Sequence, residues 1–402
     1  MLRVIAIATA LPNLLIRVRG TFAKKIKGER EMKMKRLILV FMLAAALVFV
    51  ASCATAEEEQ AGLRIAIVTS MSGVDDGSFN QNNYDGILEF IRTTSPDSTV
   101  QPILEPTGDP ANAVMYVENI VAEFDIIIMP GFQFGGVGQV AADNPGTYFI
   151  LIDEWPAGFD EGLPNVRAMR FAEQESGFLA GVVAALETET GYVAFVGGMA
   201  FPPVVNYQFG FISGVNYANQ NLGTNATIID LAPFAGTDVR GINVGGNYVG
   251  DFGDLAMGRT VGEALLDAGA DIIFVAAGFS GLGVFAAVQE AGTGRVIGCD
   301  VDQFDDGAGA GGTNIVLTSA LKIMDLNVRR ALEDFYAGNW SGGNYVMTAE
   351  TDSTGLVTTP GRHQMSAPTV AEVNRLFALL QNGTIVPASN FSDFTPDNFP
   401  GL

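Results

Sequence analysis

From Leu63 onward, short runs of apolar residues alternate with segments whose apolar residues recur at helical spacing. Most runs are uninterrupted stretches of Ile, Val, Phe and Ala, which is typical of strands covered on both faces of a parallel sheet. Between two of these runs, Tyr84, Ile87 and Ile91 fall on one helical face. This alternation predicts a doubly wound α/β architecture with parallel sheets. The predicted strands are 63–69, 100–104, 125–130, 148–153, 192–197, 227–231, 271–276, 296–300 and 315–319.

The pattern indicates two such units. The run at 125–131, Asp-Ile-Ile-Ile-Met-Pro-Gly, has a counterpart at 271–278, and each ends in a glycine-rich turn before another helical segment. A predicted helix at 173–186 lies midway between the two sets of strands and is interpreted as the start of a second lobe. Loops that follow the carboxyl ends of parallel strands bind ligands, so two lobes would place these loops across a shared cleft.

The N-terminal segment predicts export. Lys33, Lys35 and Arg36 precede an apolar run at 37–50, which is too short to span a bilayer and has the features of a secretory signal. The run ends in Val-Ala-Ser-Cys53, which resembles the bacterial lipobox, in which the cysteine thiol is acylated and becomes the first residue of the mature protein. The alternative is a plain signal peptide with an incidental cysteine. Residues 1–31 are interpreted as sequence upstream of the true start.

The expected division of the chain follows from these patterns. Residues 1–53 form the upstream extension and lipoprotein signal peptide, and 54–62 form a tether. The N-terminal lobe is expected at 63–170 plus 299–320, and the C-terminal lobe at 171–298 plus 321–340. The tail at 341–402 is rich in Gly, Thr, Asn and Pro and is expected to be a loop-rich packing segment.

Charge narrows the possible partners. Residues 1–53 hold ten Lys or Arg and two Glu, so the mature chain keeps 12 basic and 42 acidic residues. This excess of acid argues against nucleic acid and anionic membrane surfaces, because both require a basic surface on the protein. It also argues against a heavily phosphorylated ligand, since few Arg or Lys side chains remain to neutralise phosphates.

The sequence offers little catalytic chemistry, and we expect neither an enzyme nor a bound cofactor. His363 is the only histidine and Cys53 and Cys299 are the only cysteines, so a hydrolytic triad or a zinc site lacks its usual ligands. The acidic segment at 300–307 fails the spacing of a calcium loop, and Gly311 stands where the bidentate Glu belongs. Catalysis by carboxylates alone, as in glycosidases, stays open.

The loop after the first predicted strand carries a resemblance to a known family. It reads Asp75-Asp-Gly-Ser-Phe-Asn-Gln-Asn-Asn-Tyr84-Asp-Gly. This segment resembles the basic membrane protein family, the substrate-binding lipoproteins of ABC importers, whose best understood members bind purine nucleosides. Further segments match in order over about 63–335 and give the resemblance its specificity; they lie at 171–181, 196–199, 248–254, 277–285, 298–303 and 317–322.

The resemblance implies a fold similar to type I periplasmic binding proteins, with two lobes joined by three crossovers around a hinged cleft. It implies an exported monomer that is anchored to the cell membrane by lipid at Cys53 and delivers a purine nucleoside to ABC permease subunits. Three other functions stay open: a receptor for a sugar or other small polar metabolite, a nucleoside-cleaving hydrolase, and a surface antigen without a transport role.

The resemblance also implies roles for ten residues. Phe252 stacks on one face of the base, with Phe79 or Tyr84 on the other. The polar edge of the base is read by Asn80 and by Asp75 or Asp76, with Asp153 at the end of the fourth strand. Asp300 accepts hydrogen bonds from the ribose, Lys322 pairs with that carboxylate or donates to the sugar, and the backbone at Gly278 approaches closely.

Each role has a structural alternative. Phe79 and Phe252 could be core anchors, and the acidic residues could cap turns or helices. Lys322 is expected to begin a helix, where a cation opposes the helix dipole, so its position indicates a specific anionic partner.

Overall fold

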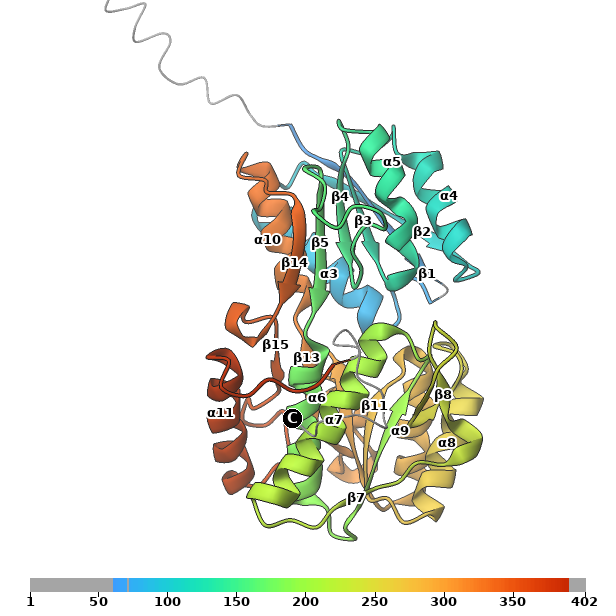
Figure 1. The fold of residues 1–402 in the computed structure, drawn as a ribbon, viewed down its shortest axis with the longest axis vertical. Helices are drawn as coiled ribbons and strands as arrows, with labels where there is room; N and C mark the ends of the chain where they lie inside the picture. The colour runs from blue at the N-terminus through green and yellow to red at the C-terminus, as the bar shows by residue number, and fades with distance from the viewer. Residues whose placement is uncertain (1–60, 71, 390–402) are drawn as a thin grey trace, which may run out of the picture. The chain divides into compact units, whose positions relative to one another are not determined.

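The computed structural model describes residues 61–70 and 72–389. Within them, the first sheet has the strand order β14-β5-β4-β3-β1-β2, and all its neighbours run parallel (Figure 1). Its strands are β1 (Arg64–Ser70), β2 (Thr99–Glu105), β3 (Ile126–Pro130), β4 (Tyr148–Ile152), β5 (Val166–Phe171) and β14 (Gly343–Met347).

Helices cover both faces of this sheet because its strands are apolar on both sides. Ile65 and Ile67 of β1 pack with α3 (Phe79–Thr93) and α10 (Met324–Tyr336). The intervening Ala66 and Val68 pack on the opposite face with α4 (Pro110–Ile120) and α5 (Gly138–Asp143). Successive side chains of a strand point to opposite faces of the sheet, so alternate residues of β1 pack into two separate cores.

The second sheet has the order β10-β6-β11-β12-β13-β15, with β7 beside β6, and only β15 runs antiparallel to its neighbour. One face is covered by α6 (Glu173–Glu187), α7 (Pro202–Asn221) and α11 (Ala367–Gln381), and the other by α8 (Leu255–Asp267) and α9 (Gly281–Ala291). A small hairpin of β8 (Gly236–Thr237) and β9 (Asn243–Gly245) is separate. The sheet strands are β6 (Tyr192–Gly197), β7 (Thr227–Ile228), β10 (Asn247–Tyr248), β11 (Ile272–Ala276), β12 (Arg295–Asp300), β13 (Val316–Lys322) and β15 (Thr354–Leu356).

Glycines let α6 and α7 pack closely. A Cβ atom added to Gly181 of α6 would lie 2.1 Å from the carbonyl oxygen of Phe211 in α7, and one added to Gly214 would lie 2.0 Å from that of Phe178. Larger residues at these positions would force the helices apart. The close packing holds Tyr207 of α7 against the strand ends of the second sheet, where it contacts the site described below.

The chain passes between the two sheets three times: from β5 into α6, from β13 into α10, and from β14 toward β15. The predicted α/β class with parallel sheets is therefore confirmed. In the described ranges, no helix combines the length and the apolar character needed to cross a membrane.

Three segments differ from the predicted division. Residues 299–320 were expected in the first lobe, but β13 pairs with β12 in the second sheet, because its apolar run extends that sheet. Residues 321–340 were expected in the second lobe, but Met324 and Val328 of α10 pack with α3 on the first. The tail at 341–402 was expected to be loop-rich, yet it contributes β14, β15 and α11. Cys53 and the rest of 1–60 lie outside the described residues.

Candidate functional site

A cavity of about 940 Å³ lies where the strand ends of the two sheets meet, within the size range of small-molecule sites. Its wall combines loops after β1, β3 and β4 of the first sheet with loops after β6, β10, β11 and β12 of the second. All the residues predicted to bind ligand lie on it except Tyr84: Asp75, Asp76, Phe79, Asn80, Asp153, Phe252, Gly278, Asp300 and Lys322.

Tyr84 packs against the core of the first sheet instead of lining the cavity. Phe79 is the first residue of α3, and Tyr84 lies five residues further along. Five residues turn a helix by about 140° and advance it by about 7.5 Å, so the two side chains point in different directions. Of the two aromatic candidates on this helix, Phe79 is the one at the cavity.

Asp75 and Asp76 are adjacent in the loop before α3, but their side chains have different surroundings. Asp76 is buried and its carboxylate accepts hydrogen bonds from the backbone N–H groups of Ser78, Asn80 and Gln81 at 3.1, 2.9 and 3.0 Å. This carboxylate therefore caps the first turn of α3, as the structural alternative proposed. Asp75 is exposed on the cavity wall.

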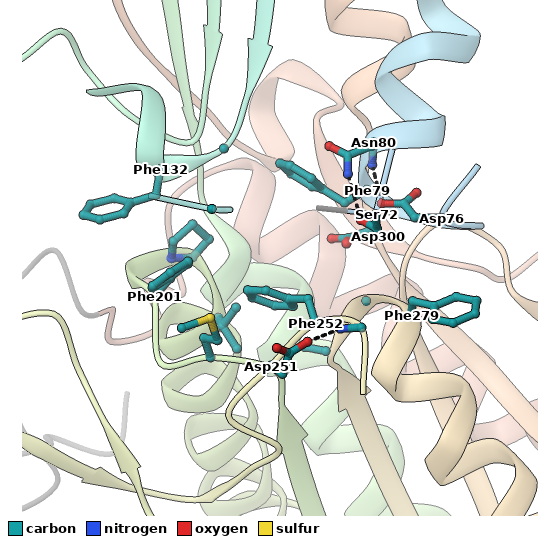
Figure 2. Close-up of a pocket in the computed structure, with 18 of the residues that line it drawn as sticks. Ser72, Asp76, Phe79, Asn80, Phe132, Phe201, Asp251, Phe252, Phe279 and Asp300 are labelled. Carbon is teal, nitrogen blue, oxygen red and sulfur yellow. Dashed lines mark hydrogen bonds between the residues drawn. The ribbon is translucent and has the colours of Figure 1, made fainter. Parts of the chain in front are cut away.

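Asn80 presents an unused acceptor. Its Nδ2 donates to Ser72 Oγ at 3.1 Å, which fixes the orientation of the amide (Figure 2). Its Oδ1 is buried and has no hydrogen-bond partner among the described residues. A buried acceptor without a partner is costly, so a ligand N–H or O–H at this position would be favourable.

Asp300 ends β12 with a φ of 66°, a left-handed conformation that is uncommon for a residue with a side chain. Its carboxylate accepts hydrogen bonds from Tyr207 Oη at 3.0 Å and from Ser78 Oγ at 3.3 Å. Ser78 belongs to the first lobe and Tyr207 to the second, so Asp300 bonds to both sides of the cavity. Asp153, just after β4, has a similar φ of 71°. Such backbone strain is concentrated at functional sites.

Lys322 has a different partner from the predicted one. It is the last residue of β13 and does not begin a helix, and its side chain is 2% exposed. Its Nζ lies 2.5 Å from Asp153 Oδ1 and 2.9 Å from Glu173 Oε1. Burial disfavours the ammonium, but the surrounding carboxylates outweigh it and raise the pKa of Lys322 above its usual value. The ion pair expected with Asp300 is replaced by this Asp153–Lys322–Glu173 cluster.

Aromatic rings form much of the remaining wall. In Figure 2, Phe79 points into the cavity from the first lobe and Phe252 from the second, with Asp300 beside the space between them. The Phe252 ring packs on Gly198, where an added Cβ would lie 2.3 Å from the ring. Phe201 lies 5.9 Å from Phe252 between ring centroids and 5.6 Å from Phe132 of the first lobe.

Two residues of the cavity wall, Phe132 and Tyr207, and one residue behind it, Glu173, were not predicted from the sequence. Phe132 follows the Gly131 turn after β3, so the rule that loops at strand ends bind ligands could have found it. Tyr207 sits within a long apolar helix, where it resembles a core residue. Glu173 does not line the cavity and is reached only through Lys322. In the part of the chain that the structure describes, no group of three or more His, Cys, Asp or Glu is arranged to hold a metal ion.

Comparison with known proteins agrees with this geometry. The family described as ABC transporter substrate-binding protein, PnrA-like, matches residues 64–230 and 240–375. The chain belongs to this family. Members are substrate-binding proteins of ABC importers and not enzymes; they work outside the cytoplasm and deliver small molecules to a permease.

Relatives of the chain include nucleoside-binding and antigenic proteins. It is 27% identical over 335 residues to the ABC transporter nucleoside-binding protein BmpA of Lactococcus lactis, covering 78% of this chain and 88% of that protein. It is 27% identical over 341 residues to the CD4+ T-cell-stimulating antigen of Listeria innocua, covering 80% and 89%. A solved ABC-transporter solute-binding protein from Aeropyrum pernix shares the fold, with a TM-score of 0.67, 23% identity and coverage of 81% of this chain and 93% of that one.

Proposed function

We propose that the chain binds a purine nucleoside in the cavity between its two sheets and delivers it to an ABC permease. The observation that carries this proposal is the placement of Phe79 and Phe252 on opposite lobes, facing the same space, with the Asp300 carboxylate beside it (Figure 2). Two aromatic rings suit a flat base because each base face can stack, at about 1–3 kcal/mol per contact. The relative that is named for nucleoside binding supports the same ligand class.

The polar groups near α3 favour a base edge that donates hydrogen bonds. Asn80 Oδ1 is a buried acceptor without a partner, and Asp75 adds an exposed carboxylate on the same wall. Asp76 is excluded from this role because three backbone N–H groups already occupy it. Bases with an N1–H, such as hypoxanthine and guanine, match these acceptors better than adenine, which presents an acceptor at N1.

The sugar is assigned to Asp300. A carboxylate at the cavity wall accepts hydrogen bonds from ribose hydroxyls, and the charge strengthens each bond. Lys322 is held by two carboxylates, so we assign it the role of fixing Asp153 and not of donating to the ribose.

Calorimetric titration of ligand-free protein with inosine, guanosine, adenosine and ribose tests the proposal. We expect inosine and guanosine to bind more tightly than adenosine, and free ribose to bind most weakly. Ribose binding more tightly than every nucleoside would instead establish the alternative function, a receptor for a sugar or other small polar metabolite. Release of free base during the titration would favour the hydrolase.

We also propose that Cys53 carries the lipid that holds the protein at the outer face of the membrane. Support comes from the lipobox-like Val-Ala-Ser-Cys sequence, which lies outside the described residues. The test compares the full chain with Cys53→Ser after expression in a bacterial host and detergent phase separation. The native chain should enter the detergent phase and the variant should not; equal partitioning of both would exclude the anchor.

A further inference from the structure

The Asp153–Lys322–Glu173 cluster has more potential negative than positive charge and is almost inaccessible to solvent. Its three side chains are between 0 and 5% exposed, and they come from the crossover into α6, the end of β4 and the end of β13. One ammonium faces two carboxylates. With all three groups ionised, the cluster would hold a net negative charge away from water, and an uncompensated buried charge is strongly unfavourable.

The two carboxyl groups are not equivalent. Glu173 also accepts a hydrogen bond from Asn206 Nδ2 at 2.8 Å, and it is the first residue of α6, where the helix dipole favours an anion. Asp153 bonds to Lys322 but gains neither the amide nor the helix terminus, and it lines the cavity, which Glu173 does not. The excess proton therefore belongs on Asp153.

We propose that Glu173 is a positioning residue that keeps Asp153 partly protonated near neutral pH, and that filling the cavity completes this protonation with a proton taken up from solvent. A ligand displaces water from the cavity wall, which removes the remaining solvation of the Asp153 carboxylate and favours its neutral form. This inference rests on the cavity being the solute site and is independent of which solute it takes.

The other carboxylates near Asp153 also favour its protonated form, whereas Lys322 opposes it. Burial raises the pKa of Asp153 to about 7, and the carboxylates of Glu173 and Asp300 add to this against the opposing pull of Lys322. Asp76 of the first lobe adds negative charge near Asp300. Tyr207 and Cys299 face Asp300, but burial raises the pKa of both well above the usual value, so they stay neutral. Lys322 is the only cation in the cluster.

The first test needs no ligand. Infrared spectra of the unliganded protein, recorded from pH 5 to pH 9, should contain a carboxylic-acid carbonyl band that titrates near pH 7. We expect Asp153→Asn to remove the band, and Glu173→Gln to shift its loss toward lower pH, because the remaining Lys322–Asp153 pair is then neutral. A spectrum in which Asp153→Asn removes no band titrating above pH 6 would overturn the proposal.

The second test uses inosine as the probe. Calorimetry in buffers of different ionisation enthalpy should show uptake of about half a proton per inosine at pH 7, rising toward one at pH 8. The Kd should increase about tenfold from pH 7 to pH 8.5 in the wild type and less than twofold in Glu173→Gln. A purely structural role of Glu173 would weaken binding equally at every pH, which would contradict the proposal.

Glu175→Gln is the matched control. Glu175 is a partly buried carboxylate two residues along the same helix, but it accepts hydrogen bonds from Thr354 and Ala349 and forms no ion pair with Lys322. Its replacement should leave the proton count and the pH dependence of inosine binding unchanged. If inosine does not bind at all, the assignment of a nucleoside as ligand is wrong. The infrared titration would still show whether Asp153 is protonated near neutral pH.

Discussion

The rings of Phe132 and Phe201 lie 5.6 Å apart between centroids and belong to opposite lobes. Phe132 follows β3 of the first sheet, whereas Phe201 precedes α7, which covers the second. Both line the cavity, and Phe201 continues the contact to Phe252 at 5.9 Å. A chain of aromatic contacts thus joins the first lobe to the ring proposed to stack on the ligand.

This contact should stabilise the closed, ligand-bound form. Phe132→Ala and Phe201→Ala should each weaken inosine binding about 2–10-fold, mainly through faster dissociation, because an aromatic pair contributes about 0.5–1.5 kcal/mol. The double variant should be little weaker than either single variant, since both remove the same contact. Stopped-flow dissociation rates measure this; fully additive effects would show that the rings act separately.

Phe252 should matter most for the base. Phe252→Ala is expected to weaken inosine binding about 5–150-fold, and Phe252→Tyr should restore most of it, because a stacking ring is regained. Phe377→Ala is the control, since Phe377 also packs partly buried against the core that Phe252 contacts but lies on α11, away from the cavity. Equal losses in the two alanine variants would mean that general destabilisation causes the effect.

Asp300 should matter for the sugar and not for the base. Asp300→Asn is expected to weaken inosine binding about tenfold or more, because a hydrogen bond to a charged group contributes about 1.5–3 kcal/mol. Binding of free hypoxanthine should change less than twofold. Asp305→Asn, an exposed acid on the same segment, controls for net charge. An equal loss of affinity for inosine and hypoxanthine would show that Asp300 does not bind the ribose.

Removing the ammonium of the cluster should destabilise the fold in a pH-dependent way. Lys322→Met leaves two buried carboxyls without their cation, which should cost about 3–5 kcal/mol at pH 8. Burial raises the pKa of both carboxyls in the folded state, so the folded protein binds more protons than the unfolded chain and is relatively more stable at low pH. Urea unfolding at pH 5 should therefore show a smaller loss, and an equal loss at both pH values would contradict this.

Uninterrupted apolar runs were enough to predict most strands, because both faces of a parallel sheet are buried. The strand β5 escaped because Arg167 and Arg170 interrupt its run; they pair with Asp334 and Glu154. The strand β14 is a partly exposed edge strand and has little apolar signal. Its place in the first sheet depends on a crossover that local sequence does not encode.

Most of the cavity wall was also predicted, since loops that follow parallel strands converge. The contacts between the side chains of this wall were not predicted. Lys322 could be recognised as needing an anion, but the choice of Asp153 and Glu173 over Asp300 is set by how β4, β13 and α6 meet. Similarly, only the three-dimensional turn of α3 shows that Phe79 and not Tyr84 reaches the cavity.

Native mass spectrometry of the protein, purified without any unfolding step, can decide whether the cavity holds a purine nucleoside. Two aromatic rings and a carboxylate around one cavity predict that part of the protein retains a solute with the mass of a purine nucleoside, and that Phe252→Ala retains none. The opposite result would be a retained solute with the mass of a free sugar that Asp300→Asn loses and Phe252→Ala keeps. In that case the cavity binds a sugar and Phe252 does not stack on a base.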